Sequence, residues 1–65
     1  MTHQPTFSDA QIELLLDLLE TERRELPVEI RHTDNETVHE QLRQRQRMVE
    51  ELIRQLQPLA TAGRA

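Results

Sequence analysis

Apolar residues recur at alternating intervals of three and four in two separate segments of this chain. This spacing places the apolar side chains along one stripe of an α-helix. Pro27 separates the two segments, and proline both lacks a backbone N–H and disfavours helical geometry at the residue before it. We therefore expect an all-α fold in which two amphipathic helices form an antiparallel hairpin.

The first helix is predicted to run from about residue 9 to residue 25. Ser8 is a favourable N-cap, and Gln11 follows three residues later, as in a capping box. Leu14 and Leu18 widen the apolar arc to about half of the helix circumference, which is more than one neighbouring helix can cover. The main stripe consists of Ile12, Leu15, Leu19 and Leu26.

Residues 26–33 are expected to form the connection between the helices. Val28 and Ile30 alternate with charged residues there, so we expect both to turn inward and close the end of the bundle. Thr33 is predicted to be the N-cap of the second helix, with Glu36 as its partner in a second capping box.

The second helix is predicted to cover about residues 34–57 and to end before Pro58, which leaves residues 58–65 as a disordered tail. Because this helix is expected to be longer than the first, its last apolar side chains would overhang in a lone hairpin; these are Leu52, Ile53 and Leu56. Its stripe again follows the 3-4 spacing and consists of Val38, Leu42, Arg45, Val49, Leu52 and Leu56.

The size of the chain favours association. It has 65 residues and no cysteine, so it forms one structural unit without disulfides or thiolate metal sites to compensate for a small core. Heptad spacing on both helices favours the shallow crossing of coiled-coil-like bundles. We expect a homodimer in which two hairpins form a four-helix bundle, with an interface made by Ile12, Leu15, Leu19, Leu42, Val49, Leu52 and Leu56.

The charge pattern excludes several classes of partner. The net charge is −4, and such a mildly acidic chain lacks the positive surface that phosphate backbones require. Arg43, Arg45 and Arg47 point in different directions on a helix, so they do not form one basic patch. Glu13 and Asp17 interrupt the longest leucine-rich segment, and the N-terminus lacks the features of a signal peptide. We expect a cytoplasmic protein that binds neither nucleic acid nor membranes.

Glu22 and Arg45 are the two charged residues set into the apolar stripes. One interpretation is an ion pair, within a hairpin or between chains, that determines register or partner choice. The alternative is that both side chains lie at the rim, with packed aliphatic stems and solvated heads. The sequence leaves both interpretations open.

A metal site is the runner-up hypothesis. Glu36 and His39 form a Glu-x-x-His pattern, and Glu22 offers a carboxylate from the other helix, which together make the half-site of a di-metal carboxylate bundle. Alternatively, His32, Glu36 and His39 could hold a zinc ion on one surface. Glu36 and His39 are expected to project away from the core stripe, however, and Glu36 is suited to the helix cap.

Catalytic and nucleotide-binding patterns are missing from the sequence. Ser8 is the only serine and is expected to cap a helix, and the single glycine, Gly63, excludes a glycine-rich phosphate loop. We therefore expect a non-enzymatic protein–protein interaction or assembly module with no cofactor and no small-molecule substrate. Two alternatives stay open, a metal-binding helical bundle and a regulatory subunit that binds a different protein.

Overall fold

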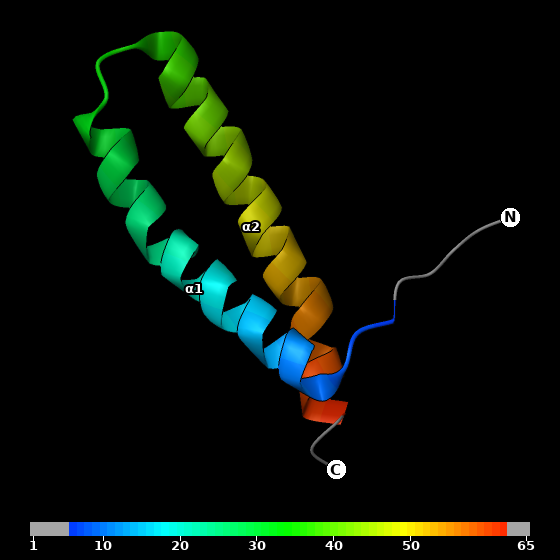
Figure 1. Ribbon diagram of the computed structural model, residues 1–65. Coiled ribbons are helices and arrows are strands. Elements are labelled where there is room, and N and C mark those ends of the chain that lie inside the picture. Colours follow the sequence, from blue (N-terminus) through cyan, green and yellow to red (C-terminus); the bar gives the residue numbers. More distant parts are fainter. Residues whose placement is uncertain (1–5, 63–65) are drawn as a thin grey trace, which may run out of the picture.

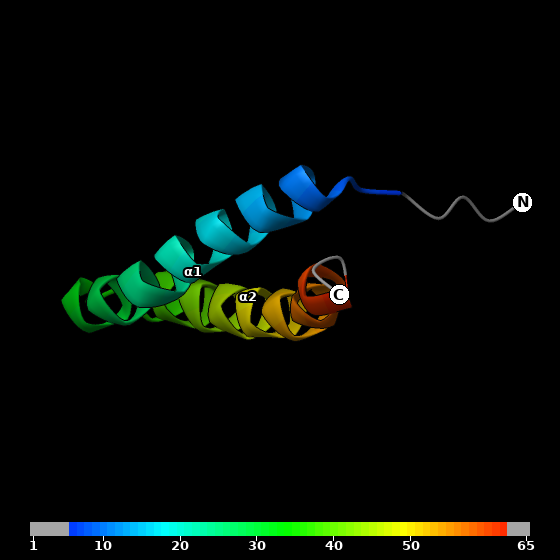
Figure 2. The ribbon, with the colours of Figure 1, turned by 90° about the horizontal axis from the view of Figure 1, so that it is seen from below.

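The protein is a hairpin of two helices. The computed structural model describes the backbone of residues 6–62 and the side chains of residues 6–60. Helix α1 spans Asp9–His32 and helix α2 spans Glu36–Ala62, and the two pack against each other (Figure 1). The predicted helical hairpin is thereby confirmed. In Figure 1 the two helices are seen apart near their connection and overlap near the chain ends. In Figure 2, which is turned by 90°, they overlap near the connection and are seen apart near the chain ends. The two helices therefore twist around each other along the hairpin.

The start of α1 is confirmed in detail. The backbone N–H of Gln11 donates to Oγ of Ser8 at 3.1 Å, and the backbone N–H of Ser8 donates to Oε1 of Gln11 at 2.9 Å. These reciprocal bonds satisfy N–H groups that have no partner within the helix. Asp9 adds a negative charge in the first turn, where the helix dipole favours it.

The end of α1 differs from the prediction, because the helix continues through Pro27 to His32 instead of ending near residue 25. The fixed φ of proline is compatible with helical backbone, and the cost comes from ring crowding and the lost bond to the carbonyl of Arg23. Leu26 offsets this cost. The helical path buries its side chain completely, in a cluster with residues of α2.

The continued helix also changes the residues that follow Pro27. The alternation in the sequence predicts that Val28 and Ile30 turn inward together, as in an extended segment. On a helix, residues two apart point in different directions. Val28 is 44% exposed, and the inward orientation predicted for it is wrong, whereas Ile30 is half-buried.

The connection is shorter than the predicted segment 26–33. Thr33 does not cap α2; it ends α1 as its C-cap, with extended backbone (φ −98°, ψ 133°). The N-cap role passes to Asn35, whose Oδ1 accepts hydrogen bonds from the backbone N–H groups of Thr37 at 2.9 Å and Val38 at 3.1 Å. Asparagine caps helices at least as well as threonine, so the second capping box predicted at Thr33 is replaced by an equivalent cap two residues later.

Helix α2 likewise extends past its predicted end. It passes through Pro58 and reaches Ala62, so residues 58–62 of the predicted disordered tail are helical, and residues 63–65 lie outside the described residues. Alanine at positions 60 and 62 favours helix strongly, which offsets part of the proline cost. Because α1 has 24 residues and α2 has 27, the two helices are closer in length than predicted. Of the three side chains expected to overhang, Ile53 is only 7% exposed and Leu56 is half-buried, whereas Leu52 is 44% exposed.

The core fills the seam between the helices. Its buried cluster consists of Leu26, Val49 and Ile53, and the partly buried side chains packed against it are Leu16, Leu19 and Leu42. Ile12 is also buried. No polar or charged side chain among the described residues is buried. The core is therefore a narrow apolar strip that leaves most of each helix exposed.

Candidate interaction surface

One side of the hairpin carries an apolar groove of about 350 Å³. The groove is lined by Leu18, Leu19, Glu22, Arg45, Met48, Val49 and Leu52, and its lining therefore comes from both helices. Leu18 is 57% exposed, Met48 58% and Leu52 44%. Leu14 lies one turn before Leu18 on α1 and is 57% exposed. We call Leu14, Leu18, Met48 and Leu52 the apolar face.

Helix periodicity explains why α2 contributes to this face. Its buried residues are Val49 and Ile53, and three half-buried residues continue the same stripe with spacings of three or four: Leu42, Gln46 and Leu56. This stripe faces α1. A second set with the same spacing lies on the neighbouring stripe, and every member is exposed: Val38, Gln41, Arg45, Met48, Leu52, Gln55 and Leu59. This second set, the exposed stripe of α2, is apolar or uncharged except at Arg45.

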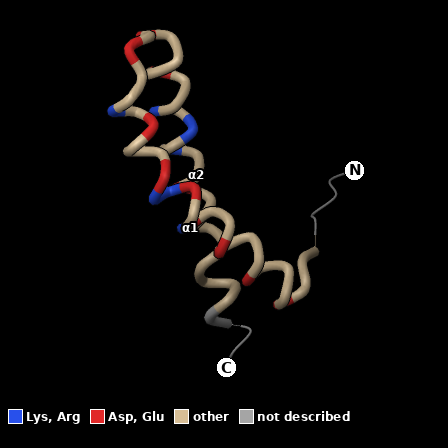
Figure 3. Tube along the Cα trace, turned by 60° about the vertical axis from the view of Figure 1, so that its left-hand side comes forward, with Lys and Arg blue, Asp and Glu red and all other residues tan. Residues whose placement is uncertain are grey.

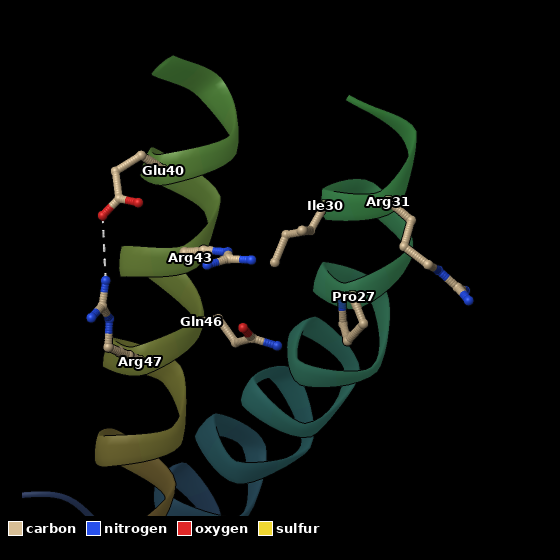
Figure 4. Close-up of a pocket in the computed structure, with 7 residues that line it drawn as sticks. All are labelled: Pro27, Ile30, Arg31, Glu40, Arg43, Gln46 and Arg47. Carbon is tan, nitrogen blue, oxygen red and sulfur yellow. Dashed lines mark hydrogen bonds and ion pairs between the residues drawn. The ribbon is translucent and has the colours of Figure 1, made fainter. Parts of the chain in front are cut away.

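The opposite side of the hairpin is polar. A groove of about 800 Å³ near the connection is lined by Pro27, Ile30, Arg31, Glu40, Arg43, Gln46 and Arg47 (Figure 4). Arg47 pairs with Glu40 at 3.4 Å, Arg43 points across the gap toward Ile30, and Arg31 points away from the gap. Because the three arginines do not converge, this groove does not form a shared anion site.

The acidic residues of α1 form another separate surface. Before Arg23, the charged residues of this helix are all acidic, and Figure 3 shows them along the N-terminal half of α1. Asp9, Glu13 and Asp17 are four residues apart and exposed, so they share one stripe. That stripe is centred on a different side of α1 from Leu18, although Asp17 lies beside Leu14, three residues before it.

The structure brings Glu22 and Arg45 together across the hairpin. Nε of Arg45 donates to Oε1 of Glu22 at 3.1 Å. The side chain of Glu22 is 29% exposed and that of Arg45 is 60% exposed, so the pair lies at the rim of the seam and borders the apolar groove. An ion pair this exposed contributes only about 0–1 kcal/mol to the stability of a single hairpin.

The candidate metal ligands are not gathered into a site. Glu22 lies in the middle of α1, His32 in its last turn and Glu36 in the first turn of α2, with His39 one turn further. Within residues 6–62, no group of three His, Cys, Asp or Glu side chains is placed to hold a metal ion. The geometry therefore offers no support for the metal-binding hypothesis.

Most residues predicted for the interface between copies instead pack between the two helices of a single chain. Ile12 and Val49 are each 6% exposed, and Leu19 and Leu42 pack against the core. Leu15 and Leu56 are half-buried, and Leu52 alone is exposed. The predicted α2 stripe combined positions from two stripes, because Leu42, Val49 and Leu56 face α1 whereas Val38, Arg45 and Leu52 do not. Met48 is therefore absent from the predicted interface, although the exposed stripe has the same 3-4 spacing.

Neither a membrane-spanning helix nor a similar known protein points to a function. In the part that the structure describes, neither helix contains a stretch long and apolar enough to cross a lipid bilayer. Comparison of the chain with protein-family models, with curated proteins and with solved structures gave no match. The apolar face is therefore the feature from which a function can be inferred.

Proposed function

We propose that this protein is a non-enzymatic assembly module that pairs with a second copy of itself through the apolar face. The supporting observation is the contrast between the two sides of the hairpin, one with exposed leucine and methionine side chains in a groove and the other lined with charges. Single exposed apolar residues are normal on protein surfaces. A contiguous apolar groove is typical of an interaction site.

The small core supports a second copy as the occupant. One hairpin buries only Ile12, Leu26, Val49 and Ile53 among its described apolar side chains. Full burial of a leucine or methionine contributes about 1.5–3 kcal/mol, and about half of each side chain in the apolar face is still exposed. Covering the apolar faces of two copies therefore contributes on the order of 10 kcal/mol before association costs, which is comparable to the total stability of a small domain.

The shape of the hairpin also suits this arrangement. Two hairpins that bury the same face against each other form an isologous interface with two-fold symmetry, the commonest kind in soluble oligomers. The heptad spacing of both helices is typical of the packing in four-helix bundles. The product would be a four-helix bundle with the polar sides of both hairpins in water.

Two substitutions at positions whose native side chains are equally exposed test the proposal. Leu52 and Val28 are each 44% exposed, but Val28 lies outside the apolar face. We expect light scattering to give twice the chain mass of 7.7 kDa for the unmodified protein and for Val28→Gln. Leu52→Gln should weaken the dimer at least about tenfold in Kd, because it buries an amide among apolar side chains.

Two results would contradict the proposal. The first is a unit mass of one chain for the unmodified protein across micromolar to millimolar concentrations, with full helicity by circular dichroism. The second is an equal weakening of the dimer by Leu52→Gln and Val28→Gln. Equal effects inside and outside the apolar face would mean that the contact between the copies lies elsewhere.

A further inference from the structure

The exposed stripe of α2 is complementary to the same stripe of a second copy when the two helices are antiparallel. Consider two copies of α2 placed antiparallel, with Met48 of each copy opposite Leu52 of the other. The same register then places Arg45 of each copy opposite Gln55 of the other, and Gln41 opposite Leu59. Two apolar layers form the centre of the contact, and a layer with an arginine and a glutamine lies on each side of them.

We infer that the second copy docks on the apolar face in this antiparallel register, and that Arg45 of each copy determines the orientation by contacting Gln55 of the other. This inference rests on the proposed self-association. It goes further because it states how the two copies are oriented and which residues select that orientation.

Charge favours the antiparallel orientation over the parallel one. In a parallel pair the exposed stripes would place Arg45 beside Arg45 of the second copy, within an otherwise uncharged contact. In the antiparallel register the two arginines are separated by the helix rise between positions 45 and 55, which is about 15 Å. The repulsion between them is therefore weaker than between two adjacent arginines, because the Coulomb energy falls with distance.

The Glu22–Arg45 pair fits the same contact. The pair borders the groove, so docking of a second hairpin removes water from it. Arg45 keeps its own counter-ion through Nε, and its guanidinium carries four further N–H donors. The side-chain carbonyl of Gln55 in the second copy is an acceptor for one of them. The contact with Glu22 therefore lowers the cost of removing water from the arginine.

Register shifts are disfavoured by the same stripe. Sliding the second copy by one heptad in one direction places Leu52 opposite Gln41, and sliding it in the other direction places Leu52 opposite Gln55. Each shift separates the leucine from Met48 and sets an amide against an apolar side chain. Buried amides without hydrogen-bond partners are costly, so the stripe selects one register.

Disulfide trapping tests the orientation directly, because the natural chain has no cysteine. Gln41→Cys and Leu59→Cys both place a thiol on exposed positions of the stripe. When the two variants are mixed and oxidised gently, we expect a disulfide between Cys at 41 and Cys at 59, at least about tenfold more abundant than either self-link. Identical positions would lie about 27 Å apart along the helix, whereas a disulfide needs Cα atoms within about 7 Å.

The outcomes separate this inference from the proposed function. Efficient self-linking of each variant with a poor mixed link would indicate a parallel pair and overturn the inference, while the dimer itself would stand. A dimer by light scattering with no more linking than the control pair Val28→Cys and Leu59→Cys would also overturn it. A monomer in solution would instead overturn the proposed function.

The role of Arg45 has its own test. Arg45→Met introduced into both cysteine variants removes the repulsion that opposes the parallel pair. We expect the ratio of mixed link to self-link to fall at least about tenfold while the molecule stays dimeric. An unchanged ratio in a dimeric Arg45→Met protein would show that this residue does not select the orientation.

Discussion

Leu26 is the described side chain on which the packing of the two helices depends most, because it has no exposed surface. Substitution by alanine removes three carbon groups, and about 0.8 kcal/mol for each gives a transfer loss of about 2.4 kcal/mol. The cavity left beside Val49 and Ile53 adds to this loss, because the surrounding side chains relax only partly. We therefore expect Leu26→Ala to lower the free energy of unfolding by about 3–4 kcal/mol.

Urea unfolding followed by far-ultraviolet circular dichroism measures this change. The chain concentration must be held constant, because association contributes to the apparent stability. The matched control is Val28→Ala on the same helix, where a 44% exposed side chain should cost less than about 1 kcal/mol. Thermal unfolding should show a Tm at least about 12 °C lower for Leu26→Ala. Equal losses for the two variants would refute the burial of Leu26 and with it the helical path through Pro27.

Three other substitutions test the positions where the helices differ from the sequence-based expectation. Pro27→Ala should raise the free energy of unfolding by about 1–3 kcal/mol in the same urea assay, because the helix regains a backbone hydrogen bond; a loss of stability would mean that the segment is not helical. Asn35→Ala should lower stability by about 1 kcal/mol, since Asn35 caps α2, whereas Thr33→Ala should change it by less than about 0.5 kcal/mol; the reverse order would return the cap to Thr33.

The parts of the fold that sequence reasoning predicted correctly depend on neighbours in the chain. The start of α1 needs only Ser8 and Gln11, which are three residues apart and bond to each other regardless of the rest of the molecule. The hairpin follows from two apolar stripes separated by a short connection. Helix ends were predicted less well, because Pro27 and Pro58 disfavour helix locally whereas the structure continues both helices past them.

The candidate surface required contacts that no local pattern specifies. Both stripes of α2 have the same spacing, and only the position of α1 decides that Val49 is buried while Met48 is 58% exposed. The hydrogen bond between Glu22 and Arg45 joins residues 23 positions apart. The sequence does not decide whether these two residues pair or lie separately at the rim.

The two amphipathic helices and the start of the first one follow from the amino-acid sequence, because those features arise from hydrogen bonds and side-chain spacing within a few residues. How far α1 extends and which leucines stay exposed depend on contacts between the two helices. Burial of Leu26 against α2 offsets the local cost of Pro27, and a contact between distant segments can exceed a local preference when it removes a large apolar side chain from water.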